Sequence, residues 1–288
     1  MNSKIKEKLY NDIKGDVPPV KVDVPERAQK LADFLTKHYG FYDVTFVARH
    51  VYNIFMLAMD AKHRMLFIKT GRHPELYRNE YIMGKQLWDM DNEHFLQPLY
   101  YADSGDNLFF ANEIMANGDS LQRLADSGQL GAMPADAKML LIRDLYKIFQ
   151  DLKKSDVVHR DIRPSNLAVL GEHLILIDFQ LAVSKSNYQE LESMTAGRLR
   201  GLGTRKYRYK TWHWDDSYSL LQCLKLIGCP SPQYRAEYNK IYRNIKSYIG
   251  HDVIVSSKRE SFVQRIWLKK YTWSIIFLSD PYYMAKRF

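Results

Sequence analysis

Apolar residues follow two different periods along this 288-residue chain. As far as about residue 115, short apolar and aromatic runs are separated by turn-length polar pieces, which is typical of antiparallel strands. From about residue 134 onward, most apolar positions recur at the spacing of one helix face. The change of period predicts an α+β fold with two lobes, a small β-rich lobe and a mainly helical one, which meet near residues 113–120.

The same pattern sets approximate bounds for the elements. Helical spacing predicts helices over residues 26–40, 74–90 and 134–154. Strands are expected at residues 43–49, 52–60, 64–71, 96–103 and 108–115, and two shorter ones at 167–170 and 174–177. We therefore predict a leader and one helix in residues 1–40, an N-lobe in residues 41–115 and a C-lobe in residues 116–288.

Composition narrows the setting of the protein. The hydrophobic content of 46% is enough for a core, and the net charge of +9 favours anionic partners. No window reaches the roughly 18 uninterrupted apolar residues of a membrane span, and the charged first residues do not form a signal peptide. The two cysteines, Cys223 and Cys229, indicate a reduced, cytoplasmic chain and offer too few ligands for a Cys/His metal site.

One short loop carries the candidate chemistry. In the segment HRDIRPSN, at residues 159–166, Asp161 can accept or orient a proton and Asn166 can offer its carbonyl oxygen to a cation. Asp178 follows the predicted strand at 174–177, where its carboxylate could complete a metal site with that amide. Phosphoryl transfer needs such groups, because the charge of a polyphosphate must be neutralised while a hydroxyl is held in line.

These residues resemble the protein kinase superfamily. The pattern H-R-D, then N, then D-F is matched by His159, Arg160, Asp161, Asn166, Asp178 and Phe179. The resemblance follows the same order along most of residues 45–225 and implies a two-lobed kinase fold with ATP and Mg²⁺ in the cleft. It also implies that Asn166 and Asp178 hold the metal and that Asp161 orients the acceptor hydroxyl.

The resemblance extends to residues outside the loop. Lys69, in the third predicted strand, would clamp the phosphates with Glu80 as its helix partner, and Glu75 is the competing choice for that partner. The region between the lobes is similar to a kinase hinge, in which Glu113 and Met115 would present backbone groups to adenine. Further implied positions are the phosphoryl-steadying cation Arg163, the loop anchor Asp216 and the docking residue Thr204.

Two positions depart from the kinase pattern. The glycine-rich loop that would cover the phosphates is replaced by ARHVYNI, in which the side chains of Arg49, His50 or Asn53 would substitute as phosphate contacts. Gln180 stands where a glycine usually follows D-F. Glutamine restricts the backbone there but removes no metal ligand, so we expect an active enzyme whose loop does not switch.

The acceptor is left open among three readings. Thr204 and Arg163 favour a serine/threonine protein kinase, so a protein hydroxyl is the first expectation. The missing glycine loop and the basic aromatic tail at residues 258–288 favour a kinase of a glycan hydroxyl in lipopolysaccharide, on an anionic membrane surface. That tail also reads as a last core helix. The third reading is a pseudokinase scaffold. Dispersed basic residues without a recognition motif predict no specific nucleic-acid binding.

Overall fold

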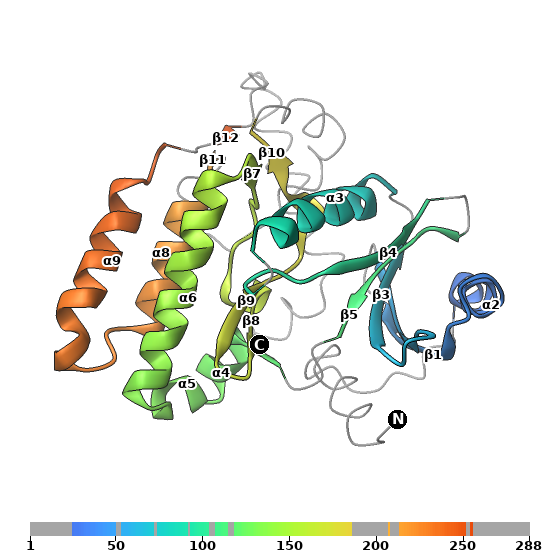
Figure 1. The fold of residues 1–288 in the computed structure, drawn as a ribbon, viewed down its shortest axis with the longest axis horizontal. Coiled ribbons are helices and arrows are strands. Elements are labelled where there is room, and N and C mark those ends of the chain that lie inside the picture. The colour runs from blue at the N-terminus through green and yellow to red at the C-terminus, as the bar shows by residue number, and fades with distance from the viewer. Residues whose placement is uncertain are drawn as a thin grey trace, which may run out of the picture.

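The structure is a computed structural model, and it describes residues 25–49, 53–71, 74–91, 93–103, 107–114, 118–185, 207, 213–251 and 254–255. Figure 1 shows two lobes. One lobe is a sheet with helices packed against it, and the other lobe is mainly helical. The predicted two-lobed α+β fold is therefore confirmed. His50, Met115, Thr204 and the tail at 258–288 lie outside the described residues.

A five-stranded antiparallel sheet forms the first lobe, with strand order β1-β2-β3-β5-β4. Its strands are β1 (Tyr42–Arg49), β2 (Asn53–Met59), β3 (Met65–Gly71), β4 (Pro98–Ala102) and β5 (Phe109–Glu113). All five match strands predicted from apolar runs. Successive side chains of a strand point to opposite faces of the sheet, so each strand contributes side chains to both faces.

The two faces of this sheet are covered by different helices. On the back face, α2 (Glu26–Tyr39) packs its apolar stripe onto the strands. Members of this shared core are Ala28, Leu31, Leu35, Phe41, Ile54, Met56, Ala58, Leu66, Ile68, Phe109 and Ala111. On the other face lies α3 (Pro74–Met90), whose Tyr77 packs with Leu108 and Phe110. The face that carries α3 also bears Phe67 and Lys69, which line the cavity beside the helical lobe.

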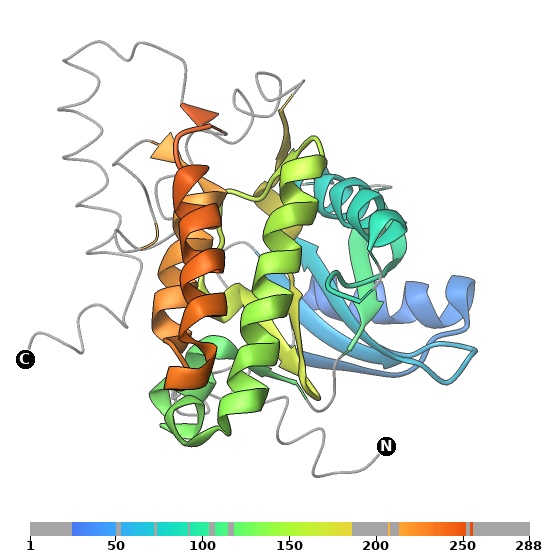
Figure 2. The same ribbon diagram turned by 60° about the vertical axis from the view of Figure 1, so that its left-hand side comes forward.

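The second lobe is built around one long buried helix. It contains α4 (Leu121–Asp126), α5 (Gln129–Ala132), α6 (Ala135–Lys154), α8 (Asp216–Ile227) and α9 (Arg235–Ser247). Figure 2 shows α6, α8 and α9 side by side. The predicted stripe of α6 is buried in the core of this lobe, where Leu141, Leu145, Ile148 and Leu152 are at most 4% exposed.

Short strands and 3-10 turns connect the longer elements of the chain. One three-stranded sheet has the order β6-β8-β9, formed by β6 (Asp119–Ser120), β8 (Leu167–Leu170) and β9 (His173–Leu176). Two further pairs join β7 (Val157–Val158) to β10 (Val183–Ser184) and β11 (His213–Trp214) to β12 (Ile254–Val255). The 3-10 turns are η2 (Pro164–Asn166), η3 (Phe179–Leu181) and η6 (Pro232–Tyr234). Residues 159–166 thus run between β7 and β8, and Asp178 follows β9 directly before η3.

Candidate active site

The loop between β7 and β8 is anchored from below by α8. The carboxylate of Asp216, in the first turn of α8, accepts hydrogen bonds from the backbone N–H groups of His159 (2.6 Å) and Arg160 (3.0 Å). Arg160 adopts a left-handed backbone conformation with φ of 67°, which is costly for a residue with a Cβ. Its Nε donates to the carbonyl oxygen of Leu181 at 2.6 Å. The loop is therefore tied both to α8 and to the segment that follows Asp178.

Asp161 and Asn166 are held against each other within this loop. The side-chain amide of Asn166 donates to the backbone carbonyl (2.9 Å) and to the carboxylate (3.1 Å) of Asp161. Both residues are buried, whereas Arg163 is half-exposed and places Nη2 3.4 Å from the same carboxylate. The Asp161 carboxylate is thus oriented by a neutral donor on one side and a cation on the other.

Lys69 joins the two lobes through two carboxylates. Its Nζ lies 2.7 Å from Glu80 Oε1 and 2.8 Å from Asp178 Oδ1. Sequence reasoning left Glu75 as an alternative partner, but Glu75 lies in the first turn of α3, and Glu80, more than one turn later, faces the lysine. The pair predicted first is the one that the structure brings together, and Asp178 is its third member.

Burial and charge act against each other in this triad. Burial alone would lower the pKa of the Lys69 ammonium, but Asp178 and Glu80 raise it above its ordinary value. Burial raises the pKa of Glu80 to about 7, and the neighbouring ammonium opposes that rise. For Asp178, the attraction of Lys69 outweighs burial and leaves the pKa lowered. At neutral pH the triad therefore holds a charged lysine beside an ionised Asp178, the state that a metal ligand needs.

His159 positions the strand end that carries Asp178. Its ring Nδ1 accepts from the backbone N–H of Asp161 (3.2 Å), and its Nε2 lies 2.9 Å from the carbonyl oxygen of Ile177. The two contacts together specify a neutral ring with its proton on Nε2. Burial lowers the pKa of His159 to about 4, which agrees with that neutral form.

A cavity of about 220 Å³ opens between the sheet and β8, next to Lys69. Residues lining it include Phe67, Lys69, Asn112, Glu113, Ile114, Ala168, Ile177 and Asp178. Phe67 stacks on Phe55 with ring centroids 5.4 Å apart and supplies a flat apolar wall. Asn112 Oδ1 is buried in this wall without a hydrogen-bond partner, so a donor group on a bound ligand would satisfy it.

Asn53 is predicted from the sequence to contact phosphate, and in the structure its side chain bonds to those of Tyr77 and Gln180. Its Oδ1 accepts from the hydroxyl of Tyr77 (2.6 Å), and its Nδ2 lies 3.5 Å from Gln180 Oε1. Asn53 therefore connects β2 to both α3 and η3. The side chain of Arg49 lies outside the part of the chain that the structure describes. Glu113 ends β5 and lines the cavity, and its contact with adenine stays a prediction.

Three contributing residues went unnoticed in the sequence: Tyr77, Asn79 and Asn112. The amide of Asn79, on α3, is shared among the carbonyl oxygens of Phe179 (3.2 Å), Gln180 (3.1 Å) and Ala182 (2.6 Å). Asn79 adjoins Glu80, so its place beside the expected helix partner was the one available signal. A polar residue on the buried face of a helix invites the question of what it bonds.

Relatives of this chain are found among protein kinases. Over 154 residues it is 27% identical to the serine/threonine-protein kinase LATS2 of Mus musculus, a match that covers 48% of this chain and 14% of that protein. A calcium/calmodulin-dependent protein kinase of Emericella nidulans, cmkA, is 24% identical over 157 residues, covering 52% and 37% of the two chains. A probable serine/threonine-protein kinase of Dictyostelium discoideum, ndrC, is 30% identical over 107 residues, covering 36% and 8%.

Solved structures agree at the level of the fold. The crystal structure of a kinase domain superposes with a TM-score of 0.52 over 80% of this chain and 83% of that one, at 14% sequence identity. No protein-family model matches the chain. The chain spans well under half the length of each relative named above. The two-lobed fold is therefore that of a kinase domain, and over about a third to a half of its length the chain is similar to serine/threonine and calcium/calmodulin-dependent protein kinases.

Proposed function

We propose that this protein is an ATP- and Mg²⁺-dependent phosphotransferase that moves the γ-phosphate of ATP to a hydroxyl group. The observation that carries the proposal is the position of Lys69, which bridges Glu80 of the first lobe and Asp178 of the second beside the interlobe cavity. Asp161 and Asn166 lie in the adjoining loop, already oriented by each other. A cation and two carboxylates at the cavity, with a third carboxylate and an amide in the adjoining loop, suit a polyphosphate with its metal.

The donor set fits magnesium. Asp178 and Asn166 offer the hard oxygen ligands that Mg²⁺ prefers, and we assign the metal to them. When bound, the ion neutralises charge on the phosphate oxygens. Lys69 holds the α- and β-phosphates and remains protonated, because its raised pKa keeps it charged throughout the physiological range. Asp161 orients the acceptor hydroxyl and takes its proton, and Arg163 adds positive charge beside it.

We further propose that the site is assembled before any ligand binds. Asn79 holds the backbone of η3, and Asn53 lies between the side chains of Tyr77 and Gln180. In this protein Gln180 thus offers a side-chain contact where a glycine would offer none. An active-site loop held in this way supports the expectation of an enzyme that does not switch.

A protein hydroxyl is the acceptor that we favour. The relatives named above are protein kinases, which supports a protein substrate. A glycan acceptor at a membrane has no comparable support here. Among the described residues, no helix combines the length and the apolar character needed to cross a bilayer. Peripheral contact through residues 258–288 stays a prediction, since that segment lies outside the described part.

Nucleotide and metal binding can be tested by thermal shift. We expect ATP to raise the melting temperature more with Mg²⁺ than without it, and Asp178→Asn to abolish the magnesium-dependent part. Asp126→Asn, which changes an exposed carboxylate on α4, is the matched control and retains the full shift. A shift that does not depend on Mg²⁺, or one that survives in Asp178→Asn, would contradict the metal assignment.

Transfer itself is tested with labelled ATP, first with generic protein acceptors and then with a membrane lipid extract. Asp161→Asn should keep the ATP shift and lower transfer by about 10²–10⁴-fold, because the base is lost and the binding groups remain. Label in lipid alone would favour the glycan acceptor. Nucleotide binding without transfer to either class would favour the pseudokinase.

A further inference from the structure

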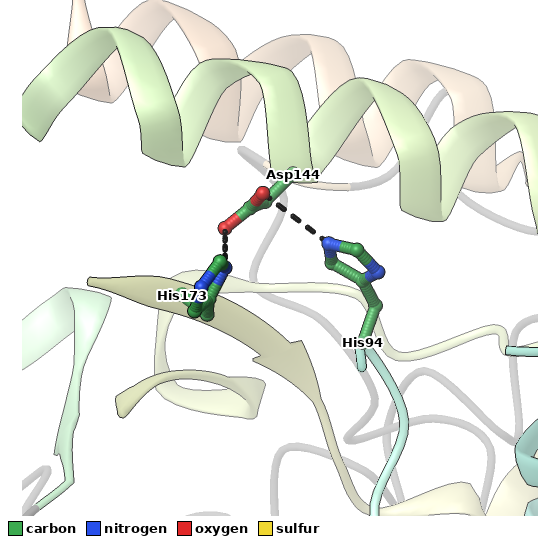
Figure 3. A group of neighbouring side chains, drawn as sticks. All are labelled: His94, Asp144 and His173. Atoms are coloured by element: carbon green, nitrogen blue, oxygen red, sulfur yellow. Dashed lines mark ion pairs between the residues drawn. The ribbon is translucent and has the colours of Figure 1, made fainter. Parts of the chain in front are cut away.

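Two histidines and one aspartate meet on the side of the molecule where the linker between α3 and β4 crosses α6. His94 comes from that linker, Asp144 from α6, and His173 is the first residue of β9. Figure 3 shows both imidazole rings directed at the Asp144 carboxylate. His94 Nε2 lies 3.2 Å from Asp144 Oδ1, and His173 Nδ1 lies 3.3 Å from Asp144 Oδ2. The three residues are 50 and 29 positions apart, so no spacing motif announces them.

The cluster is closed on one side and open on the other. His94 is 5% exposed and Asp144 is 6% exposed, whereas the side chain of His173 is 56% exposed. Two of the three groups are therefore withdrawn from water, and the third lies at the surface. An ion could enter past His173 and keep one position for water, which is the arrangement of an open three-ligand zinc site.

His94 directs its second ring nitrogen, Nε2, at the carboxylate of Asp144. Its Nδ1 lies 2.9 Å from Asp91 Oδ2, so the carboxylate of Asp91 orients the ring and favours the proton on Nδ1. The lone pair of Nε2 is then directed at the cluster. Nε2 is buried 3.2 Å from Asp144 Oδ1. With the proton on Nδ1, it has no hydrogen to donate to that oxygen. A carboxylate behind the imidazole is the usual support of a metal-bound histidine.

The donor atoms of the three residues lie close enough together to share one ion. Metal–nitrogen and metal–oxygen bonds of zinc place neighbouring ligand atoms about 3.3 Å apart. The two histidine nitrogens lie 3.2 and 3.3 Å from the oxygens of Asp144, and one ligand atom from each residue falls within 4.8 Å of the others. Asp144 is itself oriented, because Oδ2 accepts from the backbone N–H of Leu174 at 2.9 Å.

We propose that His94, Asp144 and His173 form a binding site for a divalent transition-metal ion of the zinc type. Two imidazoles and one carboxylate suit Zn²⁺, whereas Mg²⁺ and Ca²⁺ prefer oxygen ligands alone. This site is separate from the one assigned to Mg²⁺ at Asn166 and Asp178, and it does not depend on the proposed phosphotransfer.

An ion bound there would link three segments on which the active site depends. It joins α6 to the start of β9 and to the linker that leads from α3 into β4. The same linker already contacts the other end of β9, where the backbone N–H of Leu176 donates to the carbonyl oxygen of His94 at 3.0 Å. Asp178 follows two residues later. We therefore expect the metal to stabilise the folded protein by mass action.

A metal-free account of the cluster is also chemically sound. Burial would lower the pKa of His94, but the nearby carboxylates of Asp144 and Asp91 raise it overall. A protonated His94 would then form an ion triad with both carboxylates. The two accounts differ in one measurable respect. The metal site needs the exposed His173 as a ligand, whereas the ion triad of His94, Asp144 and Asp91 does not include it.

The test uses the full chain after removal of metals with a chelator. One equivalent of Zn²⁺ should raise the melting temperature, an equal amount of Mg²⁺ without nucleotide should not, and His173→Ala should lose the zinc effect. His38→Ala, which removes an exposed histidine from α2, is the matched control and should respond as the native protein does. Co²⁺ provides an independent readout through the visible absorption of the tetrahedral ion, and His173→Ala should weaken it strongly.

Two results would overturn the proposal. One is the absence of any zinc effect in the native chain, which would leave the ion triad as the explanation. The other is an equal zinc effect in His173→Ala, which would place the metal elsewhere. His94→Gln is the second variant and should also lose Co²⁺ binding. Should its buried position prevent folding, the exposed His173 still decides the question.

Discussion

At the residue scale, His159 connects two loops of the candidate active site through its ring nitrogens. The ring lies fully buried beside Phe179, with ring centroids 4.7 Å apart, and both nitrogens have backbone partners. One partner is the N–H of Asp161 and the other is the carbonyl of Ile177, which precedes Asp178. A single neutral imidazole therefore links the two loops that carry the proposed base, Asp161, and the proposed metal ligand, Asp178.

The neutral ring predicts a pH dependence of stability. The pKa of His159 is about 4 in the folded chain and 6.5 in an unfolded one, so between these values the unfolded chain binds a proton that the folded chain does not. Its contribution is fully present above pH 6.5 and is lost as the pH falls toward 4, with a slope of at most about 1.4 kcal/mol per pH unit. When the unfolding free energy is measured by urea denaturation at several pH values in this range, it should change less steeply with pH in His159→Gln than in the native protein.

The control for this experiment is His38→Gln, because His38 is exposed on α2. Its slope should equal that of the native protein. Equal slopes in the native chain and in His159→Gln would mean that the ring at position 159 is not kept neutral by burial.

At the element scale, the contact between α3 and η3 holds the turn that follows Asp178, the proposed metal ligand. Asp178 adopts a left-handed conformation, with φ of 71° and ψ of 64°, directly before η3. Such a conformation costs free energy for a residue other than glycine and persists where its surroundings hold it. Asn79 provides that hold, because its one amide serves three carbonyl oxygens of the following turn.

Asn79→Ala should therefore cost about 1–3 kcal/mol of unfolding free energy, since it leaves buried carbonyl groups without a donor. We also expect a smaller magnesium-dependent ATP shift, because Asp178 is no longer held in place. Asn239→Ala, at an exposed position of α9, is the matched control and should change stability by less than about 0.5 kcal/mol. If both variants unfold alike, the contact between α3 and η3 does not stabilise the site.

At the scale of the whole molecule, the first lobe has helices on both faces of its sheet. The helix α2 lies on the side away from the second lobe, as Figure 1 shows. Leu31 and Leu35 are fully buried there against strand residues such as Phe109. The apolar stripe of α2 is part of the core that contains Leu66 and Ile68 of β3, the strand that carries Lys69.

Leu31→Ala tests this role of α2. The change should lower the unfolding free energy by about 2–5 kcal/mol, as expected for a buried leucine whose removal leaves a cavity. Thr36→Ala, on the exposed side of the same helix, should have little effect in the same chemical denaturation measurement. An equally small effect of both changes would show that α2 is dispensable for the sheet.

Elements that depend on local backbone geometry could be predicted from the order of apolar and polar residues. Strand and helix periods follow from the backbone, so the five strands of the sheet and the long helices α2, α3 and α6 could be located from apolar positions alone. Two-residue strands such as β7 and β10 could not, because they have no room for a period. The loop residues Asp161 and Asn166 could be named because they lie within one short segment.

Contacts between side chains that are distant in the sequence became visible only in the folded structure. It chose Glu80 over Glu75 for Lys69, turned Asn53 toward Tyr77, and gave Asn79 its carbonyl partners. The contacts of His94 and His173 with Asp144 on α6 are a further example of side chains that only the fold brings together. The physical reason is that such contacts depend on the path of the chain between elements and on how those elements pack, and a local pattern of polar and apolar positions carries neither.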